Sequence, residues 1–532
     1  MSESPSLPHL SGWDADWAGL RVVVTGLGVT GFSAADTLAE LGAEVIVLDG
    51  ATSEKKRMDA ETLKIVGVKD VRFGTEHLEQ LPTFDAGPCQ LVVTSPGWRP
   101  DAPLMRDAAS RGVPVWSDIQ LAWRLGARPG AKTPQWLVLT GTNGKTTTVT
   151  LLEAMLQADG RRAVACGNIG LPVLDAIRDP EGYDALAVEL SSFQLHWTEA
   201  HGAEASGAQR SAETEQGRSL DLSPTASAVL NIAHDHVDWH GDFGGYWADK
   251  AKIFHSTRVA CIYNAADPET EKMVREADVV EGCRAVSFTT DTPAVSQIGL
   301  VRSDDGDDLL VDRAFLDDRR HQALELGLRS DLGPVAPKHL VANALAAAAL
   351  ARAAGVEPEA IRQALRDHTP GDHRIQPVAK AADVLWINDS KATNPHAAEA
   401  SLSSFSDIVW IAGGLPKGVD YDPLIQQIAS RLRYVILIGT DSSQLRSSLE
   451  RHAPQVPVLG GGAGEDETQA QLRSTDGAAA MRAAVSAANR SAEPGHTVLL
   501  APAAASMDQF RSYAERGQAF IDAVAALMEN QT

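Results

Sequence analysis

Short apolar runs alternate with helical patterns along most of the chain, which is typical of parallel α/β sheets. RVVVT at residues 21–25 is a predicted buried strand, and a glycine-rich turn and the helical pattern FSAADTLAELG follow it directly. Two more strands are predicted at EVIVLD and QLVVTSPG. The Pro- and Gly-containing segment at 127–134 interrupts this alternation. We therefore expect a first domain over residues 1–131, built on a Rossmann-like sheet.

A second α/β unit begins at QWLVLT and continues through DALAVELSS and SAVLNIA. The alanine-rich segment 339–355 predicts a long helix that Gly355 ends. The turn-like HTPGDHR at 368–374 separates this helix from four further apolar strands, VLWINDS, IVWIAGG, YVILIG and TVLLAPA. These patterns predict a central domain over residues 132–369 and a C-terminal, Rossmann-like domain over residues 370–532.

Two polar stretches interrupt these patterns without adding a chemical motif. Residues 199–219 lack apolar periodicity, and residues 460–471 are rich in glycine, glutamine and acidic side chains. We interpret both as surface loop insertions.

Composition narrows the class of protein. The 532 residues include 44% hydrophobic and 22% charged residues, which is sufficient for several cores. A formal charge of −23 argues against a nucleic acid or an anionic membrane as a partner, since both bind basic surfaces. Four cysteines without CxxC spacing indicate neither a zinc site nor a disulfide framework. With no signal-peptide layout and no apolar run of roughly 20 residues, we expect a soluble, cytoplasmic protein.

The first glycine-rich motif, GLGVTG at residues 26–31, lies between a predicted strand and a predicted helix, and Asp49 ends the next strand. Glycines at this place allow a tight turn and bring a helix N-terminus close to a phosphate. The motif therefore predicts a dinucleotide-type site for a phosphate-bearing ligand. A tight strand–helix turn without a ligand is the alternative.

The second motif, TGTNGKTT at residues 140–147, has the Gly-Lys-Thr core of a P-loop between a strand and a helix, although Leu139 replaces the first glycine of the general pattern. In a P-loop, backbone N–H groups surround the phosphates, the lysine bridges the β and γ oxygens, and a hydroxyl binds Mg²⁺. The central domain is thus expected to be a P-loop ATPase-type parallel sheet that binds ATP or GTP. The expected nucleotide-binding residues are Gly141, Thr142, Asn143, Gly144, Lys145, Thr146 and Thr147.

Metal-capable side chains follow two further strands. Glu189 precedes SSFQL, and NIAHDHVD at residues 231–238 combines imidazole, amide and carboxylate groups. Mg²⁺ suits a nucleotide site better than a transition metal does, although this mixture of ligands is compatible with either. Taken alone, Glu189 could equally be the partner of a helix N-cap.

Polar loops also follow the strands of the third unit, namely NDSKATN at 388–394 and the segment with Ser506 and Asp508. Ligands of open parallel sheets bind at the carboxyl ends of strands, so these loops are expected to form a binding site. Ordinary helix capping is the alternative, and it is plausible for Thr393 and Ser506 taken separately.

The motifs in this order resemble the Mur ligase family over nearly the whole chain: VTGLGVTGFS, TSPGW, TGTNGKTT, GNIG, ELSSFQL, NIAHDHVD, GDHR, NDSKATN, AGG with KG, and SMDQF. TGTNGK is also found in folyl-polyglutamate synthases, whereas GLGVTG, ELSSFQL and NDSKATN resemble the D-glutamate-adding members. The resemblance implies a monomeric, three-domain, ATP-dependent amide ligase with two Mg²⁺ sites. This enzyme would add D-glutamate to UDP-N-acetylmuramoyl-L-alanine through an acyl phosphate, in peptidoglycan precursor synthesis.

The resemblance also assigns roles to residues. Lys145 would contact the β- and γ-phosphates, Thr146 and Glu189 would hold Mg²⁺, and His236 would bind a second Mg²⁺ or orient the substrate. Lys250, which by itself reads as a surface lysine, matches a lysine that is carbamylated in the family and would help to hold the second ion. Adenine, phosphate and ribose would be bound by Asn343, Arg374 and Asp389. D-Glutamate would be bound by Lys391, Thr393, Lys417, Ser506 and Tyr513. The UDP-muramoyl groups would contact Val29, Thr30 and Asn168.

Three alternatives stay open at this point. A sister Mur ligase could add L-glutamate or another amino acid by the same mechanism. An NAD-linked oxidoreductase built on GLGVTG would leave the P-loop and the NDSKATN loop unexplained. A non-catalytic nucleotide switch would not need lysines, carboxylates and hydroxyls spread over three domains.

Overall fold

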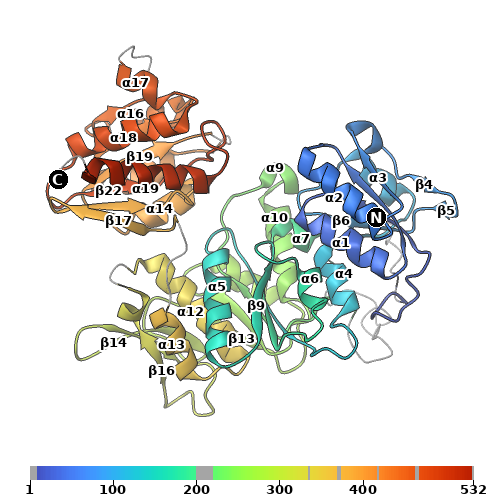
Figure 1. The fold of residues 1–532 in the computed structure, drawn as a ribbon. Helices are drawn as coiled ribbons and strands as arrows, with labels where there is room; N and C mark the ends of the chain where they lie inside the picture. Colours follow the sequence, from blue (N-terminus) through green and yellow to red (C-terminus); the bar gives the residue numbers. More distant parts are fainter. Residues whose placement is uncertain are drawn as a thin grey trace. The chain divides into compact units, whose positions relative to one another are not determined.

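The computed structural model describes residues 7, 9–198, 220–333, 336–367, 373–415, 419–461 and 467–529. The predicted insertion at 199–219, the centre of the one at 460–471 and most of the predicted boundary turn lie outside these residues. The chain forms two compact units, Met1–Ala336 with Leu340–His368, and Pro337–His339 with Thr369–Thr532 (Figure 1). Among the described helices, none is both long and apolar enough to span a membrane.

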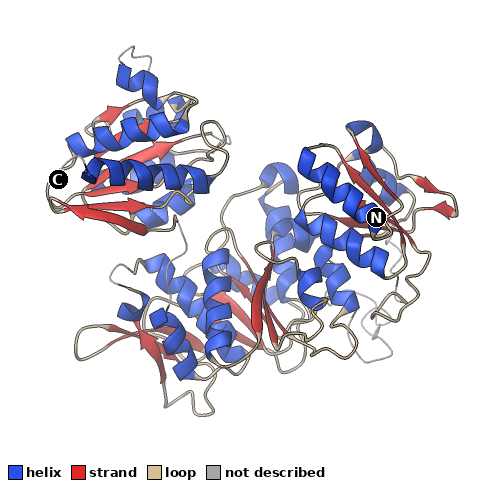
Figure 2. Ribbon diagram, in the orientation of Figure 1, coloured by secondary structure: helices blue, strands red, loops and turns tan. Residues whose placement is uncertain are grey.

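The first unit begins with a five-stranded, all-parallel sheet in the order β3-β2-β1-β6-β7. Its strands are rich in valine, and helices cover it as expected for a sheet buried on both faces (Figure 2). The strands are β1 (Arg21–Thr25), β2 (Glu44–Asp49), β3 (Asp70–Phe73), β6 (Leu91–Thr94) and β7 (Val115–Ser117), and β4 (Thr83–Phe84) pairs separately with β5 (Gly87–Pro88). The helices are α1 (Val29–Glu40), α2 (Glu54–Ile65), α3 (Pro103–Ser110) and α4 (Asp118–Leu125).

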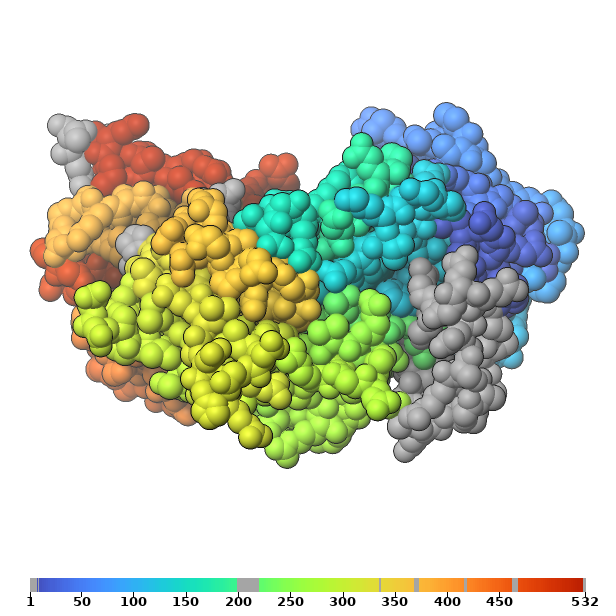
Figure 3. Space-filling view, turned by 90° about the horizontal axis from the view of Figure 1, so that it is seen from below, coloured from blue at the N-terminus to red at the C-terminus, as the bar shows by residue number. Residues whose placement is uncertain are grey.

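The same unit contains a nine-stranded sheet in the order β16-β15-β14-β13-β12-β11-β8-β10-β9. It is parallel from β9 to β14, and β14, β15 and β16 are antiparallel. The parallel strands are β8 (Gln135–Thr140), β9 (Ala163–Gly167), β10 (Ala185–Glu189), β11 (Ala226–Val229), β12 (Ala260–Asn264) and β13 (Arg284–Phe288). The last three are β14 (Gln297–Arg302), β15 (Asp308–Asp312) and β16 (Leu324–Leu328). In Figure 3 the part of the chain that holds these last three strands is the yellow-green area of the surface.

Helices pack on both faces of this nine-stranded sheet. The long helices are α5 (Lys145–Ala158), α12 (Lys338–Ala353) and α13 (Pro358–Asp367). The shorter ones are α6 (Val173–Ile177), α7 (Ser192–His196), α9 (Val237–His240), α10 (Phe243–Ala251) and α11 (Pro268–Glu276). The alanine-rich helix predicted from the sequence is α12, and its alanines pack against α5 and the sheet in one buried cluster.

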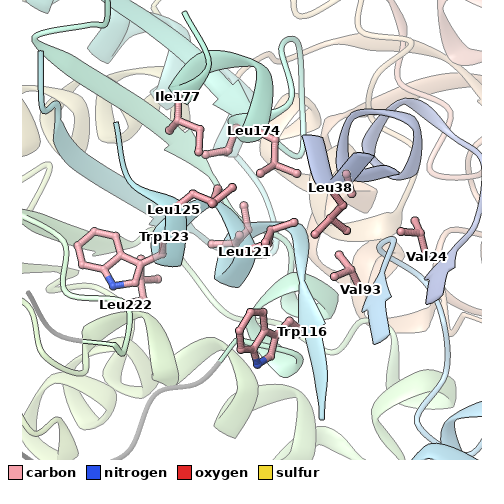
Figure 4. Close-up of a cluster of buried hydrophobic side chains, with 14 of the residues drawn as sticks. Val24, Leu38, Val93, Trp116, Leu121, Trp123, Leu125, Leu174, Ile177 and Leu222 are labelled. Carbon is pink, nitrogen blue, oxygen red and sulfur yellow. The ribbon is translucent and has the colours of Figure 1, made fainter. Parts of the chain in front are cut away.

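A second buried cluster joins the two sheets of the first unit. It contains Val24 and Val93 of the five-stranded sheet, Leu38 of α1, Leu121 of α4 and Leu174 of α6 (Figure 4). Because this apolar core is continuous, the first two sheets belong to one compact unit.

The second unit holds a six-stranded sheet in the order β17-β18-β22-β19-β20-β21. All its pairings are parallel except that between the edge strand β17 and β18. The strands are β17 (Gln376–Ala381), β18 (Val384–Asn388), β19 (Ile408–Gly413), β20 (Leu432–Ile438), β21 (Val458–Leu459) and β22 (Thr497–Leu500). The helices are α14 (Pro395–Leu402), α15 (Asp422–Ile428), α16 (Ser443–His452), α17 (Glu467–Leu472), α18 (Gly477–Ser491) and α19 (Tyr513–Glu529).

The predicted α/β class with a parallel-rich sheet in each of three regions is confirmed. The antiparallel extension from β14 to β16 was not predicted, because its strands are short and carry polar residues. The boundaries at 131/132 and 369/370 stay predictions.

Candidate active site

The P-loop joins β8 to α5 and approaches α12 closely. Gly144, at the N-cap of α5, has a left-handed backbone with φ of 84°. A Cβ atom on Gly144 would lie 2.3 Å from Oδ1 of Asn343, so a glycine is required at this position. The sequence-predicted residue Asn343 is buried and lies directly against the P-loop.

Side chains from the segment after β11 hold the P-loop in place. The Ala233 N–H donates to Oγ1 of Thr142 at 2.9 Å, and the hydroxyls of Thr142 and Tyr246 are 2.9 Å apart. The Asn143 N–H donates to Oδ1 of Asn231 at 2.8 Å, and Nδ2 of Asn231 donates back to the Asn143 carbonyl at 3.1 Å. The nucleotide loop and the NIAHDHVD segment are therefore coupled by both side chains and backbone. Sequence reasoning did not single out Tyr246.

Two lysines converge on one carbonyl of this loop. Nζ of Lys145 donates to the Gly141 carbonyl at 2.9 Å, and Nζ of Lys250 donates to the same oxygen at 3.0 Å. Lys250 is 2% exposed and also donates to Oγ1 of Thr140 at 3.0 Å. The interpretation of Lys250 as a surface lysine is therefore wrong. Burial, with a contribution from the charge of Lys145, lowers the pKa of Lys250 well below its usual range, which favours the neutral, nucleophilic amine.

Glu189 ends β10 with a buried carboxylate. Its Oε1 accepts from Nδ2 of Asn168 at 3.2 Å, whereas its Oε2 is buried without a hydrogen-bond partner. The α7 N-cap is made by Ser191 and Gln194, so Glu189 is not a cap partner. An unpartnered buried carboxylate oxygen is costly, and a hard divalent cation would satisfy it. The residues present therefore fit Mg²⁺, with Thr146 half-buried in the first turn of the neighbouring α5.

His236 lies at the N-cap of α9 in a left-handed conformation, with φ of 51° and ψ of 25°. Its ring centroid is 4.8 Å from that of Phe193, which places it beside the segment that follows Glu189. The side chain is 43% exposed, so a ligand can reach it.

Asp49 holds the glycine-rich loop after β1 through hydrogen bonds. Its Oδ2 accepts from the Leu27 N–H at 2.6 Å and from Nζ of Lys56 at 2.7 Å, and its Oδ1 accepts from the Ala51 N–H at 2.8 Å. Burial works to raise the pKa of Asp49, but these donors together hold it below its ordinary value. Both oxygens are thus engaged by the protein, unlike an acidic residue that binds the ribose of a dinucleotide. The first turn of α1 presents the exposed Val29 and the half-buried Thr30.

In the second unit, the NDSKATN loop meets the start of α19. Nζ of Lys391 lies 3.9 Å from the ring centroid of Tyr513, and Oγ of Ser390 donates to the Tyr513 carbonyl at 2.7 Å. Arg516, which sequence reasoning missed, is buried and donates to Oγ and to the carbonyl of Ser390 at 3.0 Å each. The structure thus brings Lys391 and Tyr513 together. Thr393 follows in the same loop, where its N–H donates to the Lys391 carbonyl at 2.8 Å.

Three more predicted residues belong to the second unit. Ser506 is buried after β22, and the half-buried Arg374 contributes a charge that acts on Asp389. Lys417 lies outside the described residues.

Asp389 is 7% exposed, and its carboxylate accepts from the Ile375 N–H at 3.3 Å and from Oγ of Ser401. Burial raises the pKa of Asp389 to about 6. The folded protein therefore holds this proton more tightly than the unfolded chain, whose pKa is near 3.8. Ionising the carboxylate costs stability as the pH rises from about 4 to about 6, and the full cost, at most about 3 kcal/mol, persists above that range.

Asp389→Asn is accordingly expected to stabilise the second unit by roughly 1–3 kcal/mol at pH 8, with little gain below pH 4. The amide oxygen can still accept from the Ile375 N–H, and the amide NH₂ can donate to Oγ of Ser401, whose hydroxyl can donate to the Ala397 carbonyl instead, so packing is retained. Chemical denaturation at both pH values measures the difference. An equal effect of the substitution at both pH values would contradict the raised pKa.

Family models match three consecutive parts of the chain. Residues 20–117 match the Mur ligase MurD-like N-terminal domain, residues 139–351 the Mur ligase middle domain, and residues 373–504 the Mur ligase glutamate ligase domain. Together these matches cover most of the 532 residues.

Curated relatives match nearly the whole chain. The UDP-N-acetylmuramoylalanine–D-glutamate ligase of Leifsonia xyli is 50% identical over 528 residues, which is 97% of this chain and 95% of the relative. The ligase of the same name from Streptomyces avermitilis is 50% identical over 512 residues, or 96% and 99%. Among solved structures, MurF from Acinetobacter baumannii aligns with a TM-score of 0.52 at 16% identity, covering 96% of this chain and 93% of that one. This last likeness concerns the fold alone.

Proposed function

The chain belongs to the Mur ligase family, and on that basis we propose that it is the ATP-dependent ligase that joins D-glutamate to UDP-N-acetylmuramoyl-L-alanine in peptidoglycan synthesis. The identity of about 50% to ligases of that name over the full chain supports the substrates. The chemistry is supported by one arrangement above all: Lys145 and Lys250 meet at the Gly141 carbonyl of the P-loop.

The reaction begins when the L-alanyl carboxylate attacks the γ-phosphorus of ATP, so that a P–O bond forms, the bond to ADP breaks and an acyl phosphate results. Both reactants are anions, and the ammonium of Lys145 and the P-loop N–H groups offset the repulsion between them. Thr146 and Glu189 would hold Mg²⁺, which would supply further positive charge at the phosphate oxygens. The D-glutamate amine then attacks the acyl carbon, forms the amide and expels phosphate.

A second Mg²⁺ would be held by His236 and by carbamylated Lys250. The neutral amine of Lys250 can add to CO₂ and release a proton, which converts the buried amine into a carbamate that ends in a carboxylate. The lowered pKa of Lys250 and its burial support this modification, because only the free amine reacts.

The remaining contacts are distributed over the whole chain. We assign adenine, phosphate and ribose to Asn343, Arg374 and Asp389, and the P-loop contacts to Thr142, Asn143, Gly144 and Thr147 as well as Lys145. We assign D-glutamate to Lys391, Thr393, Lys417, Ser506 and Tyr513, and the UDP-muramoyl groups to Val29, Thr30 and Asn168. The domains would span residues 1–131, 132–369 and 370–532. The acyl phosphate hydrolyses in water, so closure of the C-terminal domain over the nucleotide would protect it.

We further propose that the enzyme acts as a cytoplasmic monomer. An L-glutamate-adding sister ligase is the alternative closest in chemistry, because the lysines that bind a side-chain carboxylate do not by themselves select chirality.

The test is phosphate release from ATP with UDP-N-acetylmuramoyl-L-alanine present, comparing D-glutamate, L-glutamate, other amino acids and none. Release that requires D-glutamate supports the proposal. Release with L-glutamate supports the sister ligase. No release with any amino acid, from a folded protein that binds ATP, would contradict both.

A further inference from the structure

A hydrogen-bonded cluster centred on Asp249 lies outside the residues assigned so far. Nδ1 of His196 and Nδ1 of His240 lie 2.7 and 2.9 Å from the same oxygen, Oδ2 of Asp249. Nζ of Lys252 lies 2.9 Å from the other oxygen, Oδ1. Burial alone would raise the pKa of Asp249, but the two imidazoles and the ammonium hold it well below its usual range. Asp249 is therefore a buried carboxylate with three donors.

Hydrogen bonds join both ring nitrogens of His240, whose side chain is fully buried, to neighbouring side chains. Its Nδ1 donates to Asp249, and its Nε2 lies 3.0 Å from Oγ of Ser192. The Ser192 hydroxyl can donate to or accept from Nε2, so this bond is retained in either ring form. The contacts thus run from Ser192 through His240 to Asp249, and His196 contacts the same oxygen of Asp249 as His240 does.

Each element in this cluster contains, or begins within three residues of, one of the proposed metal-holding residues. Ser192 begins α7, three residues after Glu189. His240 ends α9, and its N–H donates to the His236 carbonyl at 3.1 Å. Asp249 precedes Lys250 in α10.

Ring packing also links two of these elements, α7 and α9. The Phe193 ring of α7 lies 4.8 Å from the ring of His236 and 4.7 Å from that of Trp239, and it stacks on His240 at 5.6 Å.

We propose that His240 and His196, joined through Asp249, are positioning residues that set the spacing of Glu189, His236 and Lys250 and thereby the affinity of the site for divalent cations. The inference rests on the proposed function, because that function assigns these three residues to the metal. The network fixes the start of α7, the end of α9 and the end of α10 to one another through charge-assisted hydrogen bonds.

A transition-metal site in the cluster is the competing interpretation, since ligand atoms of His196, His240 and Asp249 lie within 4.8 Å of one another. The contacts favour a hydrogen-bond network. Both Nδ1 atoms lie at hydrogen-bond distance from Oδ2. The Lys252 ammonium lies 2.9 Å from Oδ1, where its charge would repel a metal ion bound to the carboxylate.

The test is Mn²⁺ binding in the presence of ADP, measured by electron paramagnetic resonance on the full-length protein. Asp249→Asn keeps the size of the side chain and removes its charge, and we expect its Mn²⁺ affinity to fall at least tenfold. We also expect kcat to fall, while KM for D-glutamate stays within a factor of about two. Asp312→Asn is the matched control. Asp312 lies on β15, away from the cluster, and its fully buried carboxylate pairs with Arg352 of α12. It should leave Mn²⁺ affinity unchanged.

A second pair of variants keeps the test decisive if Asp249→Asn does not fold. His196 is 28% exposed, so substitutions there are tolerated more readily than at His240. His196→Leu removes the donor to Asp249 and should weaken Mn²⁺ binding. His196→Asn retains an N–H donor in the place of Nδ1 and should restore most of it.

Unchanged Mn²⁺ affinity in folded Asp249→Asn or His196→Leu would overturn the inference. So would stoichiometric Zn²⁺ in the purified protein that is lost in Asp249→Asn, because the three side chains would then be ligands. Failure of the proposed function is a distinct result, because it would appear in the unsubstituted protein, which would then form no amide with D-glutamate.

Discussion

Replacing Lys145 with alanine is expected to reduce ligase turnover at least about 10³-fold, equivalent to a loss of about 4 kcal/mol of transition-state stabilisation. Lys145 is the ammonium at the start of α5 in the P-loop, where its Nζ lies over the Gly141 and Thr142 carbonyls. Two anions must approach each other in the first step, and no other residue of the loop carries a positive charge. Steady-state phosphate release measures the effect.

The fold should survive this substitution, because the side chain is only half-buried and its bonds are to loop carbonyls. Thermal unfolding of Lys145→Ala checks this point. Lys132→Ala is the matched control: Lys132 is 60% exposed and pairs with Asp184 at 2.7 Å, so activity should be retained. Turnover of Lys145→Ala within tenfold of the unsubstituted enzyme would exclude this loop as the ATP site.

The second large effect concerns Lys250. Lys250→Ala is expected to lower turnover by on the order of 10²–10³-fold, because it removes the carboxylate proposed to hold the second ion. Acetate should restore part of the activity, since the truncation opens a buried space beside Thr140 where a small carboxylate fits. The measurement is phosphate release as a function of acetate concentration.

Lys250→Met provides the matched control for rescue. Methionine fills the space of the lysine stem and brings no charge, so activity should be lost and acetate should not restore it. A readout independent of activity is ¹³C NMR after incubation with ¹³C-bicarbonate, in which only the unsubstituted protein should show a carbamate carbon. Absence of that signal together with absence of rescue would refute carbamylation.

The nucleotide loop could be predicted from the sequence because its determinants are local. A buried strand, a glycine-rich turn and an amphipathic helix follow each other within residues 135–158, and β8, the P-loop and α5 take these places. The same reasoning holds for the glycine loop after β1. In both cases the strand and the helix are adjacent in sequence, so their hydrophobic periodicity determines where the turn must lie.

Features that depend on distant segments could not be predicted. Burial of Lys250 results from the packing of α10 against β8, and a lysine in an amphipathic helix gives no sign of it. The Asp249 cluster requires α7, α9 and α10 to meet, and the nearest sequence signal was the excess of metal-capable residues in NIAHDHVD. The need for glycine at position 144 likewise depends on Asn343, which lies far along the chain.

The joining of the first two sheets in one compact unit also depends on contacts between segments that are distant in sequence. Leu121 of α4 and Leu174 of α6 are ordinary apolar residues in sequence, yet they complete a core that crosses the predicted boundary at 131/132 (Figure 4).

The proposed enzyme joins D-glutamate to UDP-N-acetylmuramoyl-L-alanine through an acyl phosphate. The most direct test is mass spectrometry of all products after reaction of ATP and D-glutamate with substrate labelled by ¹⁸O in its alanyl carboxylate. We expect a product extended by one glutamyl residue, ADP, and inorganic phosphate that carries one ¹⁸O from the carboxylate. Label in AMP, or phosphate release without ¹⁸O transfer and without amide, would contradict it.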